Sequence, residues 1–234
     1  MKQIEYRTKD KTTWGPGPWQ QEPDKAQWKD EATGLPCLIV RNHSGAWCGY
    51  VGLSEGHSFY GKSYSERVTP PASFADRKVD DRTPIIALFC EGAKEDGKVS
   101  LELAIDVHGG LTFSDFCGEH NRDAWEKWRS RRASWEKEAR QYPIGDAARR
   151  LREWAKELDD YDAWVLKSQS VGICHLPEEG EPERVWWFGF DCSHAGDVSP
   201  GYDRSYNSYD ESYRDIEYVK REVTNLAAQL AALR

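Results

Sequence analysis

Two short segments of the sequence combine acidic, imidazole and glycine residues at spacings that could support chemistry. In the first, Asp106 and His108 are separated by one valine and followed by Gly109 and Gly110. If this segment ends a strand, both polar side chains point to one face, because side chains alternate along a strand. A carboxylate beside an imidazole can bind a metal ion or act as an acid–base pair, and the glycines let a ligand approach the backbone. A buried, hydrogen-bonded pair with a structural role is the alternative.

The second segment runs from Asp191 to Asp197 and contains His194. It follows the aromatic stretch Val185–Asp191, which predicts a buried strand. Two carboxylates and one imidazole suit a divalent cation such as Mn²⁺, Mg²⁺ or Zn²⁺. Alternatively, the two aspartates accept hydrogen bonds from backbone amides of turns. We expect this segment and the first to line one site, although they lie more than eighty positions apart.

Further donors for a small anionic ligand occur elsewhere in the chain. A loop with His57 and Lys62 offers groups that hold phosphate or carboxylate, and Trp19 offers a face on which a base could stack. The predicted ligand-binding residues are Trp19, His57, Lys62, Asp106, His108, Gly109, Gly110, Asp191, His194 and Asp197. If the ligand is instead a metal ion, the predicted ligands are Asp106, His108, Asp191, His194 and Asp197. A divalent cation is the one cofactor that these residues indicate.

The cysteines offer two weaker interpretations. Cys174 and His175, with Cys117, His120 and Cys192, could outline a zinc site, but the paired spacing of structural zinc motifs is missing. A Cys–His dyad with Cys192 or Cys174 as the nucleophile stays open. We expect buried, reduced thiols, because none of the six cysteines forms a C-x-x-C pair.

The elements that must position these residues predict an α+β fold with a mainly antiparallel sheet. Residues rich in β-branched and aromatic types alternate with turn residues, which predicts the strands Lys25–Asp30, Leu35–Asn42, Ala46–Leu53, Val99–His108, Leu111–Phe113 and Val185–Asp191. Helical spacing predicts an inserted helical hairpin at about 121–168. Apolar residues from Ile216 to Leu230, spaced by three and four, predict a C-terminal amphipathic helix. We assign residues 1–234 to a single domain with this insertion.

Composition limits the classes of function. Eleven tryptophans and eleven tyrosines argue for an ordered core. The chain has no apolar run of about 20 residues and no apolar N-terminal stretch, so we expect neither a membrane span nor a signal peptide. A net charge of −8 disfavours non-specific nucleic-acid binding. These features predict a cytoplasmic protein, and association of identical chains is compatible with them.

Several motifs resemble those of an uncharacterised protein family common in bacteriophages and prophages. They are WGPGPWQQEPD, GHSFYGKSY, VHGGLTFS, GICH, WFGFDCSHAGD and YRDIEYVKREVTNLAAQL, in this order, and they cover about half of the chain. The resemblance implies a phage accessory protein that acts in the bacterial host cytoplasm during infection. Small phage proteins of this kind often blunt host defence, for example by binding or destroying nucleotide immune signals.

Three functions follow from these observations. The favoured one is sequestration of a small nucleotide-like ligand, which would suit an anti-defence protein. The second is metal-assisted hydrolysis of such a ligand by a phosphodiesterase. The third is a protein–protein interaction module in which the polar clusters are only structural. The sequence leaves open whether the protein is an enzyme.

Overall fold

An antiparallel sheet forms the framework that carries both polar segments. The computed structural model describes residues 3–71, 74, 97–116, 133–134, 136–137, 140–141, 149, 175, 184–202 and 211–233. Within these ranges the sheet has six strands, in the order β1 (Ile4–Tyr6), β2 (Lys25–Lys29), β3 (Pro36–Arg41), β4 (Trp47–Leu53), β8 (Trp186–Asp191) and β7 (Phe113–Phe116). All neighbouring strands are antiparallel, which confirms the predicted α+β class.

The chain divides into two compact units, residues 1–117 with 175–234, and residues 118–174. The sheet and both polar segments belong to the first unit. Nearly all of the helical hairpin predicted at 121–168 lies outside the described residues.

The turns between β2, β3 and β4 explain why this part of the sheet is readable from sequence. The Asp30 carboxylate accepts a hydrogen bond from the backbone N–H of Thr33 at 2.9 Å, and the turn ends at Gly34 with a φ of 73°. In the next turn the Asn42 side chain accepts hydrogen bonds from the backbone N–H groups of Ser44 and Ala46, each at 3.0 Å. Asp, Asn and Gly are the residues that such turns favour, so the strand boundaries follow from them.

The prediction of a strand over Val99–His108 is wrong. Only β6 (Val99–Ser100) is extended, paired with β5 (Arg67–Val68), and the chain then forms the short helix α2 (Leu101–Ala104). The alternating apolar residues that suggested a strand are buried, but Ala104, which lies between two of them, is buried as well. Beyond α2 the backbone of Asp106 bonds to side chains of the C-terminal helix rather than to a strand.

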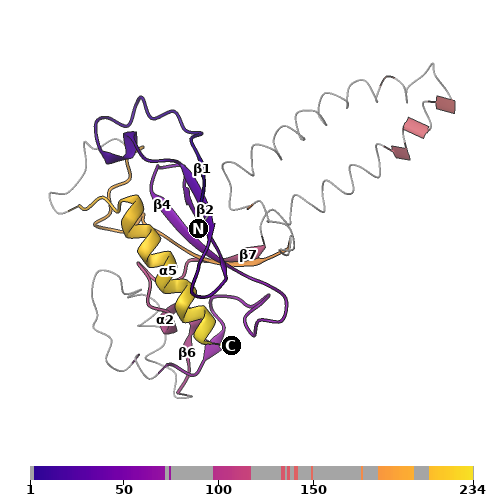
Figure 1. The fold of residues 1–234 in the computed structure, drawn as a ribbon, viewed down its shortest axis with the longest axis vertical. Coiled ribbons are helices and arrows are strands. Elements are labelled where there is room, and N and C mark those ends of the chain that lie inside the picture. The colour runs from indigo at the N-terminus through magenta and orange to yellow at the C-terminus, as the bar shows by residue number, and fades with distance from the viewer. Residues whose placement is uncertain are drawn as a thin grey trace. The chain divides into compact units, whose positions relative to one another are not determined.

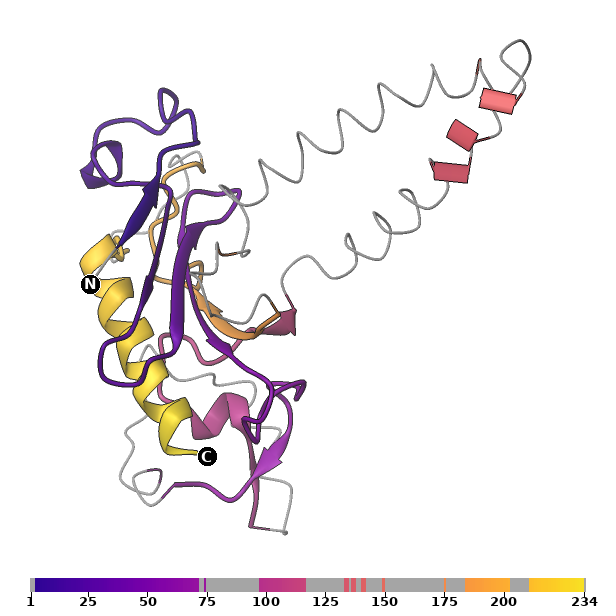
Figure 2. The same cartoon turned by 45° about the vertical axis from the view of Figure 1, so that its right-hand side comes forward.

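The C-terminal helix α5 (Ile216–Ala232) lies across one face of the sheet, as Figures 1 and 2 show. Asp215 caps it by accepting a hydrogen bond from the Tyr218 backbone N–H at 2.7 Å. The predicted apolar positions Val219, Val223, Leu226 and Leu230 are fully buried. The contact with β4 is close, because a Cβ atom added at Gly49 would come 2.6 Å from Cγ2 of Val223.

A buried network attaches the loop before β2 to the start of α5. The Glu22 carboxylate binds the Arg41 guanidinium and the Tyr213 hydroxyl, and it accepts a hydrogen bond from the backbone N–H of Ile216 at 3.1 Å. Trp47 adds a further hydrogen bond to Glu22 through Nε1 at 3.2 Å. A carboxylate suits this position because the N-terminus of a helix carries positive partial charge. The network fixes the chain at Tyr213 and therefore the neighbouring residue Arg214.

Within the described residues, no helix has the length and apolarity needed to cross a membrane.

Candidate metal centre

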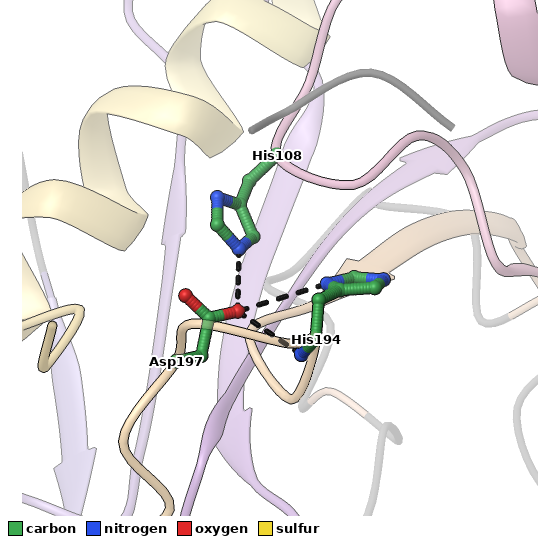
Figure 3. Close-up of side chains that lie close together, drawn as sticks. All are labelled: His108, His194 and Asp197. Carbon is green, nitrogen blue, oxygen red and sulfur yellow. Dashed lines mark hydrogen bonds and ion pairs between the residues drawn. The ribbon is translucent and has the colours of Figure 1, made fainter. Parts of the chain in front are cut away.

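Three side chains from the two polar segments meet beside the N-terminal half of α5. They are His108, His194 and Asp197, and their candidate ligand atoms all lie within 4.8 Å of one another. Figure 3 shows both histidines directed at the same carboxylate oxygen. Oδ2 of Asp197 lies 2.7 Å from Nε2 of His108 and 3.7 Å from Nδ1 of His194. The structure thus brings together one residue of the first segment and two of the second.

His108 is held by two successive turns of α5. Its backbone N–H donates to Oε2 of Glu222 at 2.9 Å, and its Nδ1 lies 2.9 Å from the hydroxyl of Tyr218. The His108 side chain is only 1% exposed. A tyrosine hydroxyl can donate or accept, so Tyr218 can satisfy Nδ1 in either tautomer of His108. Nε2 can therefore face Asp197 or an ion without leaving Nδ1 unpaired.

Asp197 is a buried carboxylate at the centre of the cluster. Oδ2 also accepts a hydrogen bond from the His194 backbone N–H at 3.1 Å, while Oδ1 accepts one from Nε of Arg214 at 2.8 Å. Burial by itself would raise the pKa of Asp197, but interactions with His108, His194 and Arg214 outweigh burial and lower the pKa well below its usual value. The cluster therefore contains a permanent negative charge at neutral pH.

His194 is the member of the cluster that reaches solvent. Its side chain is 32% exposed, yet its Nδ1 atom is buried and has no hydrogen-bond partner. The interaction with Asp197 raises the pKa of His194 and outweighs the effect of desolvation. The ring lies directly against Gly109, which has a φ of 67° and no side chain to displace it. The glycine predicted to admit a ligand thus makes room for an imidazole.

The geometry fits a single divalent ion. Zinc binds histidine nitrogen and carboxylate oxygen at about 2.0–2.2 Å, so two ligands of one ion lie about 3.0–4.3 Å apart, depending on the angle between them. The two distances to Oδ2 of Asp197, 2.7 and 3.7 Å, lie within a few tenths of an ångström of that range, and all three ligand atoms lie within 4.8 Å of one another. The His194 side chain is partly exposed, so its ring can move by the few tenths of an ångström that metal binding would require. Two imidazoles and one carboxylate suit Zn²⁺, Mn²⁺ or Fe²⁺. The Tyr218 hydroxyl on His108 is the outer hydrogen bond that metal-binding histidines generally make.

The other predicted members of the two segments have local roles. Asp191 accepts hydrogen bonds from the Ser193 backbone N–H at 3.0 Å and from the Thr112 hydroxyl at 3.1 Å, so it stabilises its own turn. The backbone of Asp106 binds the side chain of Gln229, and the Asp106 carboxylate is not part of the His–His–Asp cluster. Gly110 closes a turn by donating its N–H to the carbonyl of Val107 at 3.0 Å.

His57, Lys62 and Trp19 lie away from the cluster. His57 contacts the carbonyl of Leu230 at 3.0 Å, twelve positions beyond Tyr218, which is about 18 Å along a helix. Lys62 pairs with Glu66 at 3.7 Å on the surface. Trp19 is 3% exposed and packs edge-on against Tyr213, so its face is not open to a base. The structure therefore does not place these three residues in the same ligand site as His108.

Residues 56–63, GHSFYGKS, also fit the G-x-x-x-x-G-K-[ST] pattern of phosphate-binding loops. That pattern works when the loop opens a helix and its backbone N–H groups point at the phosphate. Here no helix follows in residues 64–71, and the N–H groups of His57, Tyr60 and Lys62 donate to carbonyls within the loop. The loop also contacts the C-terminal carbonyls of α5, where negative partial charge disfavours an anion. The pattern therefore does not form a phosphate site.

Residues 52–56, GLSEG, match the G-x-S-x-G pattern of serine hydrolases. In those enzymes the serine occupies a strained turn between a strand and a helix. Ser54 does follow β4, but no non-glycine residue among those described has a positive φ, and no helix follows within residues 54–71. The nearby His57 uses Nδ1 to accept from the Phe59 backbone and Nε2 to contact Leu230. A Ser–His pair is therefore not formed.

Thiol chemistry finds little support in the described residues. Cys37, Cys48 and Cys192 are buried free thiols, as expected. Burial raises the pKa of Cys192 well above its usual value, which suppresses the thiolate needed for nucleophilic attack. His175 packs edge-on against Trp187, with ring centroids 5.2 Å apart. The remaining members of the outlined zinc site, Cys117, His120 and Cys174, lie outside the described residues.

Three residues that support the cluster were not predicted from the sequence. Arg214 directly precedes Asp215, the residue that caps α5, and Tyr218 and Glu222 lie one turn apart within the helix. The sequence did offer one signal for Glu222, since it directly precedes Val223, one of the regularly spaced apolar residues of the predicted helix. In the structure Glu222 is only 8% exposed. A carboxylate so deeply buried needs a partner, and here that partner is the His108 backbone.

Comparison with known proteins gives no relative for this arrangement. A scan against models of protein families finds no match, and searches of curated proteins and of solved structures find none either. The resemblance to a phage family therefore stays a prediction. The protein is described by its own architecture, an α+β fold with an antiparallel sheet and a C-terminal helix that supports a His–His–Asp cluster.

Proposed function

We propose that the protein is a metal-dependent hydrolase that acts on a small anionic, nucleotide-like molecule. His108, His194 and Asp197 would hold one divalent ion. The observation that carries this proposal is the convergence of their three ligand atoms within 4.8 Å, with Nδ1 of His194 buried, without a hydrogen bond, and 3.7 Å from Oδ2 of Asp197. Three protein ligands leave a coordination position for water or substrate, which is the usual composition of a catalytic zinc site.

The surrounding residues support this role by fixing the ligands. Tyr218 orients the His108 ring, Glu222 fixes the His108 backbone, and Arg214 holds the second oxygen of Asp197. A bound divalent ion supplies an activated water and neutralises developing charge on a phosphoryl group. Removal of a nucleotide signal would agree with the expected role of a phage anti-defence protein.

Binding without turnover is the second candidate. The carboxylates in and around the cluster are engaged: Asp197 binds His108 and Arg214, Asp191 binds Ser193 and Thr112, and Glu222 accepts a hydrogen bond from the His108 backbone. Hydrolysis commonly needs a general base, and a carboxylate that already accepts hydrogen bonds is a weaker base. Sequestration of the ligand by the bound ion would not need a general base.

The test begins with protein stripped by a chelator and reloaded with Zn²⁺ or Mn²⁺. We expect hydrolysis of a panel of linear and cyclic nucleotides to require the ion and to be lost in His108→Ala and His194→Ala. The control is His57→Ala, a histidine at the opposite end of α5, which should retain activity. Recovery of unchanged nucleotide from the loaded protein would indicate sequestration. Equal activity in all three variants would contradict the proposed site.

A further inference from the structure

Two arginines lie against the same tyrosine ring next to the cluster. The guanidinium carbon of Arg214 is 5.0 Å from the centroid of the Tyr218 ring, and that of Arg221 is 5.8 Å from it. The Tyr218 hydroxyl in turn contacts Nδ1 of His108 at 2.9 Å. The arginines therefore belong to the immediate surroundings of the candidate metal ligands.

Tyr218 and Arg221 lie three positions apart in α5, which brings their side chains together on one face of the helix. Arg214 precedes Asp215, the residue that caps α5, and its guanidinium lies near the same ring. Both guanidinium groups therefore gather around Tyr218. One elongated ligand could therefore contact both guanidinium groups.

Arg221 forms no ion pair with a carboxylate within the part of the chain that the structure describes, although the chain carries a net charge of −8. Its side chain is exposed and lies near Tyr218. The neighbouring Lys220, by contrast, pairs with Glu217 at 3.4 Å. An exposed guanidinium beside an aromatic ring can donate its N–H groups to the oxygens of a phosphate.

We propose that Arg221, together with Arg214 and Tyr218, binds a phosphate group of a ligand that carries more than one phosphate. This inference rests on the proposed function and specifies its substrate class. One phosphate would lie on the ion held by His108, His194 and Asp197, while a second would contact the arginines. Two phosphates are needed because Arg221 and the cluster contact different parts of Tyr218: the Tyr218 ring centroid lies 5.8 Å from the Arg221 guanidinium carbon and 5.6 Å from the His108 ring centroid.

The test measures binding of ADP and AMP by calorimetry, with chelator-treated protein and with Mn²⁺-loaded protein. We expect ADP to bind more tightly than AMP, and Arg221→Gln to weaken ADP binding about tenfold or more, as for loss of a charge-assisted hydrogen bond. Lys62→Gln removes the same charge from the loop whose residues His57 and Ser58 contact the C-terminal end of α5, and it should change ADP affinity less than about twofold. Mn²⁺ affinity should be the same in wild type and both variants.

The outcomes separate this inference from the metal proposal. Failure of Mn²⁺ to bind, with ADP binding that still depends on Arg221, would overturn the metal site and keep the arginine site. Normal Mn²⁺ binding, with equal ADP affinity in Arg221→Gln and Lys62→Gln, would overturn the arginine site alone. Absence of ADP binding in both metal states would also overturn it.

Discussion

The imidazole of His194 lies so close to Gly109 that a Cβ atom at position 109 would come 2.1 Å from Cε1 of the ring. No carbon–carbon contact of this length is tolerated between non-bonded atoms, so the ring would have to move. Only glycine permits both this contact and the backbone φ of 67°. The contact joins the two polar segments of the sequence directly.

Gly109→Ala should therefore displace His194 and weaken metal binding. We expect the affinity for Zn²⁺ to fall at least about tenfold, the lower limit of the effect of disturbing residues that orient metal ligands. Calorimetric titration measures this affinity. Gly61→Ala is the control, because Gly61 has a similar φ of 74° but nothing within 4 Å of the added Cβ. Both variants should lose similar stability, and an equal Zn²⁺ affinity in the two would refute the role of the contact.

Tyr218→Phe should weaken metal binding without unfolding α5. The substitution removes the hydroxyl that contacts Nδ1 of His108, and loss of such an outer hydrogen bond typically lowers metal affinity about 10- to 100-fold. Tyr6→Phe serves as the control, since the Tyr6 hydroxyl is buried without a hydrogen-bond partner. Zn²⁺ titration combined with thermal unfolding checks both variants. Unchanged affinity in Tyr218→Phe would show that His108 is oriented by other contacts.

Arg41→Met should destabilise the fold strongly. The Arg41 side chain is completely buried and pairs with Glu22, so its removal leaves a buried carboxylate without its cation. Breaking such a pair costs about 3–5 kcal/mol. Urea unfolding measures the loss, and Glu22→Gln introduced into the same chain should recover part of it. A loss below about 1 kcal/mol would mean that the pair is weakly coupled to folding.

Lys25 should make stability depend on pH above neutrality. Burial lowers the pKa of Lys25 from 10.5 to about 8 in the folded state. Between these two values the unfolded chain binds more protons than the folded chain, so the free energy of unfolding contributed by Lys25 rises with pH, by about 3 kcal/mol in all. Below the folded pKa both states are protonated and this dependence ends.

The measurement compares wild type with Lys25→Met by urea unfolding at pH 7 and pH 10. Using the difference between the two proteins cancels the titration of other groups, such as the buried thiols. The variant should be the more stable protein at pH 7, and its advantage should shrink towards pH 10. An advantage independent of pH would contradict a lowered pKa for Lys25.

The sequence predicted the sheet and the C-terminal helix because local signals coincide with tertiary packing there. Turn residues such as Asn42 hydrogen-bond within their own turn, and the spacing from Val219 to Leu230 matches the buried face of α5. The prediction of a strand failed beyond Ser100, because residues 101–104 form a helical turn and the backbone of Asp106 and His108 binds the side chains of Gln229 and Glu222, more than a hundred positions away. No pattern within the segment could indicate them.

The candidate site was predictable only in part for the same reason. Residue types suggested His108, His194 and Asp197, since the chain has only six histidines and these two lie close to aspartates in the sequence. Asp191 shared that signal but binds the Ser193 backbone and the Thr112 hydroxyl, while the backbone of Asp106 binds Gln229 of α5. Selection among such residues depends on three-dimensional position, which here is set by Tyr218 and Glu222 on α5.

The most direct test of the account is the metal content of the purified protein. After removal of bound ions and reloading with Zn²⁺, calorimetry and elemental analysis of wild type should give one ion per chain. His194→Ala and Asp197→Ala should each lose most of this ion, whereas His57→Ala should keep it. Retention of a full equivalent of Zn²⁺ by the His194 and Asp197 variants, or no binding by wild type, would contradict a metal centre at this cluster.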